Sequence, residues 1–318
     1  MTTRGKAAGN ASSFSPRRLL GRTGFKATTL GIGDVADRRL PLSTCVDTVR
    51  RAIDAGLNVI DTAPSYEDGF SEEIVGRAVR DCRDRMFVID KIDEHEKAVA
   101  PQIENSLKRL CLDATDAFVF HGLSDMDTFR RLLLPGGGFE QLSDCVQAGK
   151  TRFRGISSHN PEVLSAALTA GVCDIVLFPV GPFVDGRFLT DILPLAKQQG
   201  VGTVCFKTFG AGKLLGDTPG YNQPLQARPR GKRSSGGAPS TAPALPCLSV
   251  RDCLHFTLTH DPDVALLGLS YPNEQDAAFA AALDFAPLSG PEMDRIRREA
   301  ALARKDKGPC WWNPDPEM

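Results

Sequence analysis

The chain has 318 residues, of which 42% are hydrophobic and 24% are charged, and its formal net charge is −1. This length allows one α/β barrel as well as two smaller domains. A charge so close to zero provides no field that attracts nucleic acid or an acidic membrane, so we expect small molecules or other proteins as partners.

The ends of the chain and its cysteines indicate the compartment. The first sixteen residues lack an apolar core, and no run reaches eighteen apolar residues, so neither a secretory signal nor a membrane span is predicted. Nine cysteines are scattered without a CxxC pair, which fits a reducing compartment better than a disulfide framework and offers no zinc spacing. We expect a cytoplasmic protein without a metal site, with residues 1–16 as a flexible segment.

Strand and helix patterns alternate along the rest of the chain. Residues 17–20 and 25–26 read as a small hairpin around a glycine-containing turn. Eight short apolar runs follow, at residues 28–31, 58–61, 86–92, 117–121, 153–157, 175–180, 202–207 and 264–269. Eight buried strands, each followed by a helix, predict a closed parallel (β/α)8 barrel, also called a TIM barrel. The alternative is a doubly wound open sheet, but no GxGxxG follows the first strand.

The helices between these runs are recognised by their apolar period. In the first, Ser43 is the expected N-cap, Gly56 ends the pattern, and Val46, Val49 and Ile53 share one face. Similar patterns cover residues 71–81, 101–110, 139–149, 161–171, 189–200, 250–260 and 273–283, and a last helix covers 293–305.

Two segments fall outside the alternation. Residues 224–246 are rich in Pro, Gly and Ser and basic, which favours a mobile loop after the seventh strand. Since barrel active sites form on that face, we expect a lid there, with a tolerated insertion as the alternative. Residues 306–318 form a tail whose Trp311 and Trp312 are expected to pack on the barrel. The predicted domain is therefore a single barrel over residues 17–305.

Four polar side chains come at or after consecutive strand ends. Asp61 ends the second strand, Tyr66 lies in the loop after it, Lys91 is near the end of the third strand, and His121 ends the fourth. In such barrels the carboxyl ends of the strands meet at one mouth. Alone, each residue also has an ordinary structural interpretation, such as a loop cap or a core histidine. Together they predict one catalytic site.

This set suits carbonyl reduction. Hydride arriving at a carbonyl carbon leaves an alkoxide that needs a proton, which the Tyr66 hydroxyl can supply. The free pKa of tyrosine, about 10, is high for this role, and a nearby ammonium such as Lys91 is expected to lower it. Asp61 is expected to hold Lys91, and His121 to hydrogen-bond the carbonyl oxygen.

The surrounding motifs make the resemblance specific. NVIDTAPSYEDGFSEEIVGRAV resembles the aldo-keto reductase signature, FVIDK its lysine strand and FVFHG its histidine strand. RFRGISSHNPEVL, GVGTVCFKTFGAG and VALLGLSYPNEQ are similar to the family's cofactor-binding segments. The likeness covers residues 18–288 and implies a catalytic tetrad of Asp61, Tyr66, Lys91 and His121.

The resemblance also implies the residues that bind a nicotinamide cofactor, NADP(H) or possibly NAD(H). They are Ser157 and Ser158 at the carboxamide, Phe206 against the ring with Lys207 beside it, Gly210 and Gly212 at the pyrophosphate, and Gly268, Leu269 and Ser270 at the adenosine phosphate. Leu177 replaces a glutamine common in the family. Pro272 and Glu274 fall where NADP-preferring members often carry basic residues, which puts the cofactor preference in doubt.

Three classes of function follow. The first is a reductase of small aldehydes or ketones, acting as a monomer or a weak homo-oligomer. The second is a non-catalytic, nicotinamide-binding, redox-sensing partner subunit of the same fold, which can retain all four residues. The third, a barrel isomerase or lyase, needs metal or phosphate ligands that the sequence does not show.

Overall fold

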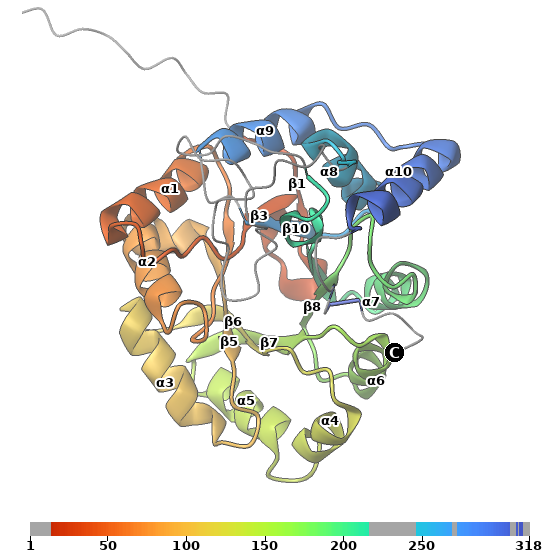
Figure 1. The fold of residues 1–318 in the computed structure, drawn as a ribbon. Coiled ribbons are helices and arrows are strands. Elements are labelled where there is room, and N and C mark those ends of the chain that lie inside the picture. The colour runs from red at the N-terminus through yellow and green to blue at the C-terminus, as the bar shows by residue number, and fades with distance from the viewer. Residues whose placement is uncertain (1–13, 216–245, 269–271, 306–309, 311, 314–318) are drawn as a thin grey trace, which may run out of the picture.

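A computed structural model describes residues 14–215, 246–268, 272–305, 310 and 312–313, and a closed parallel barrel forms its centre (Figure 1). The strands follow the order β10-β3-β4-β5-β6-β7-β8-β9, and pairing of β10 with β3 closes the ring. This closure excludes the open doubly wound sheet and confirms the predicted (β/α)8 barrel. The strands are β3 (Leu30–Ile32), β4 (Val59–Asp61), β5 (Phe87–Ile92), β6 (Thr115–Phe120), β7 (Thr151–Ser157), β8 (Ile175–Pro179), β9 (Gly202–Phe206) and β10 (Val264–Leu267).

The helices lie around the outside of the barrel (Figure 1). They are α1 (Leu42–Asp54), α2 (Phe70–Val79), α3 (Val99–Leu110), α4 (Met126–Leu132), α5 (Gly138–Gln147), α6 (Pro161–Ala170), α7 (Leu193–Gln198), α8 (Val250–Thr259), α9 (Pro272–Leu283) and α10 (Gly290–Ala303). In the part of the chain that the structure describes, none is long and apolar enough to cross a membrane.

Strand residues alternate between two apolar environments, as the period of a strand requires. Phe87 and Ile89 of β5 point into the barrel interior, whereas Val88 packs under the surrounding helices. A hairpin of β1 (Arg17–Leu19) and β2 (Lys26–Thr28) places Leu20 and Ala27 in the same interior cluster. The hairpin therefore covers one end of the barrel, and the loops that follow the strands lie at the other.

The first barrel strand begins two residues later than predicted. Thr28 belongs to the hairpin, where its amide and hydroxyl both donate to Asn58 Oδ1, at 2.7 and 3.1 Å. The chain redirects at this point, and Leu30 is the first residue that pairs with β10. The apolar run alone carries no sign of this change of partner.

Two helices also differ from the sequence prediction. Helix α1 begins at Leu42 with Pro41 as N-cap, so the N-cap prediction for Ser43 is wrong, although Val46, Val49 and Ile53 are buried on one face as expected. Helix α4 was not predicted. It has seven residues, too few to show an apolar period, and the Asp125 side chain caps it.

The structure describes parts of the three segments that lie outside the alternating strands and helices: the N-terminal segment, the predicted lid and the C-terminal tail. Residues 224–245 of the predicted lid lie outside the described residues, but the Leu248 amide bonds to Leu214 O (2.7 Å). Phe14, in the N-terminal segment, is buried and packs against Phe279 with ring centroids 5.9 Å apart. In the tail, Trp312 is buried and its Nε1 lies 3.4 Å from Phe183 O, which confirms the packing predicted for it. Trp311 lies outside the described residues.

Candidate active site

The fold brings the four predicted residues to one mouth of the barrel. Asp61 is the last residue of β4, Lys91 lies near the end of β5, and His121 follows the last residue of β6. Tyr66 lies in the turn after β4, where its amide bonds to Ala63 O (3.1 Å). Since parallel strands end at the same side, residues far apart in sequence become neighbours here.

Lys91 is the centre of this group. Its Nζ donates to Asp61 Oδ2 (2.7 Å), to Thr62 O (2.8 Å) and to the Tyr66 hydroxyl oxygen (3.1 Å). The side chain is only 2% exposed, so these three acceptors match the three protons of the ammonium. Because the Tyr66 oxygen accepts from Lys91, its own proton is left to donate in another direction.

Charge and burial act against each other in this group. Burial lowers the pKa of Lys91, but Asp61 and Tyr66 outweigh it and leave the pKa raised. For Tyr66, burial raises the pKa and outweighs Lys91, with Asp61 and Asp34 adding to the rise. The expected net lowering of the Tyr66 pKa is therefore wrong for the chain alone, since Lys91 only offsets part of the burial effect. Tyr66 carries its proton at neutral pH, as a proton donor must.

His121 has a separate set of partners. Its Nδ1 bonds to Asp93 Oδ1 and lies 3.5 Å from Ser65 Oγ. The imidazole meets the Tyr66 ring edge to face, with centroids 5.5 Å apart. The His95 Nε2 contacts the backbone oxygen of His121 at 3.0 Å. The ring is thus held between the Tyr66 phenol and the loop after β5.

Two acids at this mouth were missed by the sequence analysis. Asp93, two residues after Lys91, also accepts from the Ser65 amide (2.7 Å). Asp34 follows β3 and accepts from the Ala36 amide (2.9 Å), and burial raises its pKa to about 6. The available signal was the same as for Asp61, namely an acid at the end of an apolar run.

The predicted carboxamide serines are buried at the end of β7. The Ser158 amide donates to Leu177 O (2.9 Å), and its Oγ accepts from the Asn160 amide (3.0 Å). The Leu177 side chain lies in the barrel interior cluster. It therefore has only its backbone at this end, whereas Ser157 and Ser158 carry hydroxyl groups there.

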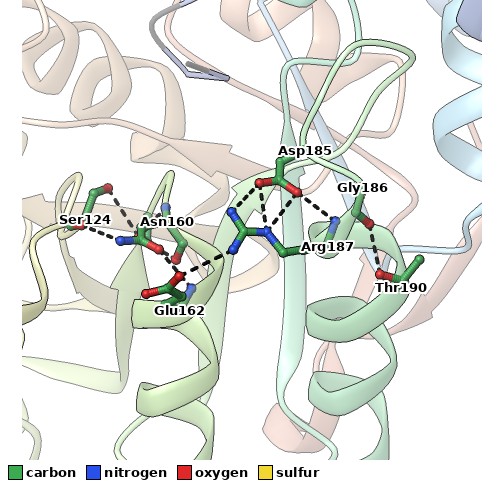
Figure 2. Close-up of polar contacts among 8 residues, drawn as sticks. Ser124, Asn160, Glu162, Asp185, Gly186, Arg187 and Thr190 are labelled. Atoms are coloured by element: carbon green, nitrogen blue, oxygen red, sulfur yellow. Dashed lines mark hydrogen bonds and ion pairs between the residues drawn. The ribbon is translucent and has the colours of Figure 1, made fainter. Parts of the chain in front are cut away.

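Polar contacts tie together the loops after β6, β7 and β8 (Figure 2). The Asn160 Nδ2 donates to Ser124 O (2.9 Å), and its Oδ1 caps α6 by accepting from the Glu162 amide (2.9 Å). Arg187 bonds to Asp185 (2.7 Å) and reaches Glu162 (3.5 Å). These contacts fix the rim next to Ser158.

The loop after β9 holds the other predicted cofactor residues. Phe206 ends the strand half-buried, and Lys207 Nζ lies 5.7 Å from its ring centroid and 5.3 Å from that of Trp312. Gly210 and Gly212 bound a short turn and have φ of 53° and 86°, which favour glycine. Beyond β10, Gly268 is exposed, and Leu269 and Ser270 lie outside the described residues.

A family model described as the aldo/keto reductase family matches residues 27–297. The chain belongs to this family. It is an NAD(P)H-dependent oxidoreductase, as the resemblance in the sequence implies.

Three known proteins are similar to this chain in sequence or structure. The L-galactose dehydrogenase of Arabidopsis thaliana is 26% identical over 92% of this chain and 96% of that protein. The NADH-specific methylglyoxal reductase of Escherichia coli is 24% identical over 62% of this chain and 66% of that protein. A Klebsiella pneumoniae aldo-keto reductase, solved in complex with NADPH, matches with a TM-score of 0.67 and 22% identity, covering 92% and 97% of the two chains.

A basic residue at the start of α9 was also missed. Arg51 of α1 bonds to Asp276, to Gln275 Oε1 (2.9 Å) and to Pro272 O (3.2 Å). Residues 268–283, directly after the last strand, contain no Arg or Lys, and Arg51 lies 221 positions before Pro272. Chain order therefore gave no signal of it.

The residues of this aldo/keto reductase fit a nicotinamide cofactor. The half-buried Phe206 ring offers a stacking surface, and Lys207 offers a positive charge near the glycine turn. Ser157 and Ser158 are buried beside them, and the Ser158 hydroxyl is bonded to Ser124 and Asn160. Within the described ranges, no three His, Cys, Asp or Glu side chains are grouped as metal ligands.

Proposed function

We propose that this aldo/keto reductase reduces small aldehydes or ketones with NADPH or NADH, or oxidises the corresponding alcohols, with Tyr66 as general acid and base. The observation that carries the proposal is the placement of Lys91 Nζ between Asp61 Oδ2 (2.7 Å) and the Tyr66 hydroxyl (3.1 Å). This contact leaves the phenol proton free for a substrate oxygen.

Each residue has one task in this proposal. The bound nicotinamide supplies or accepts the hydride. Tyr66 gives its proton to the developing alkoxide, and Lys91 stabilises the resulting tyrosinate. Asp61 keeps Lys91 in place and balances its charge. His121 contacts the reacting oxygen and orients it.

The cofactor would be held along the ends of β7, β9 and β10. Ser157 and Ser158 would bind the carboxamide, Phe206 would stack on the nicotinamide, and Lys207 would lie beside it. The backbone at Gly210 and Gly212 would approach the pyrophosphate. Gly268 with Leu269 and Ser270 would lie at the adenosine phosphate.

The similar proteins support both cofactors and both directions. One is named an NADH-specific reductase, one is named a dehydrogenase, and one was solved with NADPH. We therefore extend the proposal to either nucleotide. The non-catalytic subunit has no support from these proteins, and we do not propose it.

We also propose a cytoplasmic protein that is a monomer or a weak homo-oligomer. All nine cysteines are free, and seven of them are buried. Free thiols packed in the core are typical of a reducing compartment.

Steady-state turnover tests the proposal. A generic aromatic aldehyde is added to the protein with NADPH or NADH, and oxidation of the nucleotide is followed against a control without aldehyde. We expect aldehyde-dependent oxidation with at least one nucleotide. Its absence with both, across a panel of aldehydes and ketones, would show that the chain is not a carbonyl reductase.

A further inference from the structure

The contact between Asp93 and His121 determines which imidazole nitrogen carries a proton. The carboxylate meets Nδ1, not Nε2. Burial raises the pKa of Asp93, but the bond and charge of His121, together with the Ser65 amide, outweigh it and leave the pKa lowered. Asp93 is therefore ionised at neutral pH. An ionised carboxylate can only accept, so Nδ1 must carry a proton.

The other nitrogen faces the open mouth. Within the described residues Nε2 of His121 has no hydrogen-bond partner, and the side chain is 23% exposed. When Nδ1 is protonated, a neutral imidazole presents only a lone pair at Nε2. It can donate from Nε2 only when the ring carries both protons.

The carbonyl oxygen of a substrate determines what Nε2 must do. That oxygen has no proton and requires a donor. The fixed tautomer therefore suits a carbonyl only when the ring carries both protons, whereas an alcohol gives its single hydroxyl proton to the Tyr66 base and makes no such demand on Nε2.

We propose that Asp93 is a positioning residue that fixes His121 in the Nδ1-protonated form, so that carbonyl binding requires the doubly protonated ring. The part concerning carbonyl binding rests on the proposed function. The part concerning the tautomer does not.

Other ionisable groups lie around His121, and their effects on a pH profile must be distinguished from the effect of His121. Lys91 and Tyr66 have raised pKa values, and Asp61 is paired with Lys91. On the Asp93 side, burial lowers the pKa of His95.

Asp34 lies at the same mouth, where its charge acts on Tyr66, and it has a pKa of about 6. Two control variants, Asp34→Asn and His95→Gln, therefore show whether a change with pH belongs to His121.

Nuclear magnetic resonance of the imidazole nitrogens tests the tautomer without any substrate. Full-length, nitrogen-labelled protein is compared with Asp93→Asn, and His121→Gln assigns the signal. We expect the wild type to show the neutral ring protonated on Nδ1. Asp93→Asn should shift it toward Nε2, since an amide can donate to Nδ1. An Nε2-protonated neutral ring in the wild type would overturn the proposal, whether or not Asp93→Asn folds.

The pH profiles of kcat/KM test the consequence. We expect wild-type reduction to fall about tenfold per pH unit above one ionisation. Asp93→Asn should flatten this limb, while Asp34→Asn, His95→Gln and the surface variant Glu94→Gln keep it. A uniform loss in Asp93→Asn with unchanged profiles would mean a merely structural role. A wild type inactive at every pH would refute the proposed function and leave the tautomer result standing.

Discussion

Lys91 shows how strongly a single buried charge depends on its neighbours. Its ammonium makes three hydrogen bonds, and its side chain is 2% exposed. Removing one partner of a buried ion pair leaves the other charge without compensation, which costs more than the pair contributes. Asp61 and Lys91 should therefore act as a unit and not as two independent contributors.

A double-mutant cycle tests this coupling. Lys91→Met and Asp61→Asn should each lower kcat/KM, and the double variant should lose less than the sum of the two losses in free energy. We expect an interaction energy of about 0.5–3 kcal/mol, the range for residues in contact. Strictly additive losses would show that Asp61 does not act through Lys91.

Asp34 gives a prediction about stability and pH. Burial raises its pKa from 3.8 to about 6, so the folded chain holds this proton more tightly than the unfolded chain. The stability that the protonated carboxyl contributes is fully present below the pKa of the unfolded chain. It is lost as the pH rises through the pKa of the folded chain. Asp34→Asn removes the ionisation.

The variant should be more stable than the wild type at neutral pH by about 1 kcal/mol, a figure reduced because the side chain is only half-buried. The difference should vanish at about pH 3, as followed by urea denaturation. Asp127→Asn, on the exposed face of α4, is the control. A difference that does not change with pH would contradict the assignment.

At the scale of single residues, the sequence indicated which side chains meet at the mouth of the barrel, but it indicated their contacts less well. Asp61 and His121 were found because each ends an apolar run. Lys91 was found because it interrupts such a run, and Tyr66 because it lies in the polar loop that follows one. Asp93, the partner of His121, was missed because the end of the same strand already carries Lys91 as a candidate. The pKa of Tyr66 was misjudged because the effect of burial depends on packing that the sequence does not display.

Close packing between helices α2 and α3 depends on one glycine. A Cβ added at Gly76 would lie 1.9 Å from Leu110 O, a backbone atom that cannot move aside alone. Gly76→Ala should therefore destabilise the protein by about 1–3 kcal/mol through overpacking, despite the better helix propensity of alanine. Thermal unfolding measures the change.

Gly290 provides the matched control. It opens α10, and an added Cβ would meet nothing within 4 Å. Gly290→Ala should leave the melting temperature unchanged or slightly higher. Equal effects at the two positions would contradict the packing argument.

The start of α9 bears on the choice of cofactor. Asp276 would repel a ribose phosphate, but Arg51 already pairs with it and offsets the charge. We therefore expect weak discrimination, with NADPH preferred over NADH by less than about a hundredfold in kcat/KM.

Arg51→Met should lower kcat/KM with NADPH several-fold more than with NADH, because it leaves Asp276 uncompensated. Arg50→Met, on the same helix and paired with Asp81, is the control. A thousandfold preference for NADPH in the wild type would contradict this account. Arg51 was not predicted because a contact between α1 and α9 spans most of the chain.

Helices and strands were predicted correctly from the spacing of their apolar residues wherever they were long enough to show a pattern. Strands β5 and β6 are buried along their whole length and stood out as apolar runs. Helix α4 and the division between β2 and β3 were missed, since seven residues or a change of pairing partner leaves no periodic signal. The N-cap of α1 was predicted at Ser43 because serine is a good capping residue, but Ser43 lies one position inside the helix.

At the scale of the molecule, barrel closure is what makes a site out of scattered residues. Consecutive strands β4, β5 and β6 bring Asp61, Lys91 and His121 to one mouth, and the hairpin covers the opposite end. Eight alternating units were enough to predict this arrangement from sequence. The distances that give the residues their proposed roles required the structure.

Transfer of a labelled hydride tests the central claim most directly. The protein is given an aromatic aldehyde and the accepted nucleotide carrying deuterium at its transferable position, in ordinary water, and the alcohol is analysed by mass spectrometry. We predict deuterium on the carbinol carbon with the wild type, and Tyr66→Phe should lower kcat by about 10²–10⁴-fold with cofactor affinity within a few-fold. An alcohol without deuterium, or a Tyr66→Phe variant that keeps more than half of the wild-type kcat, would contradict the account.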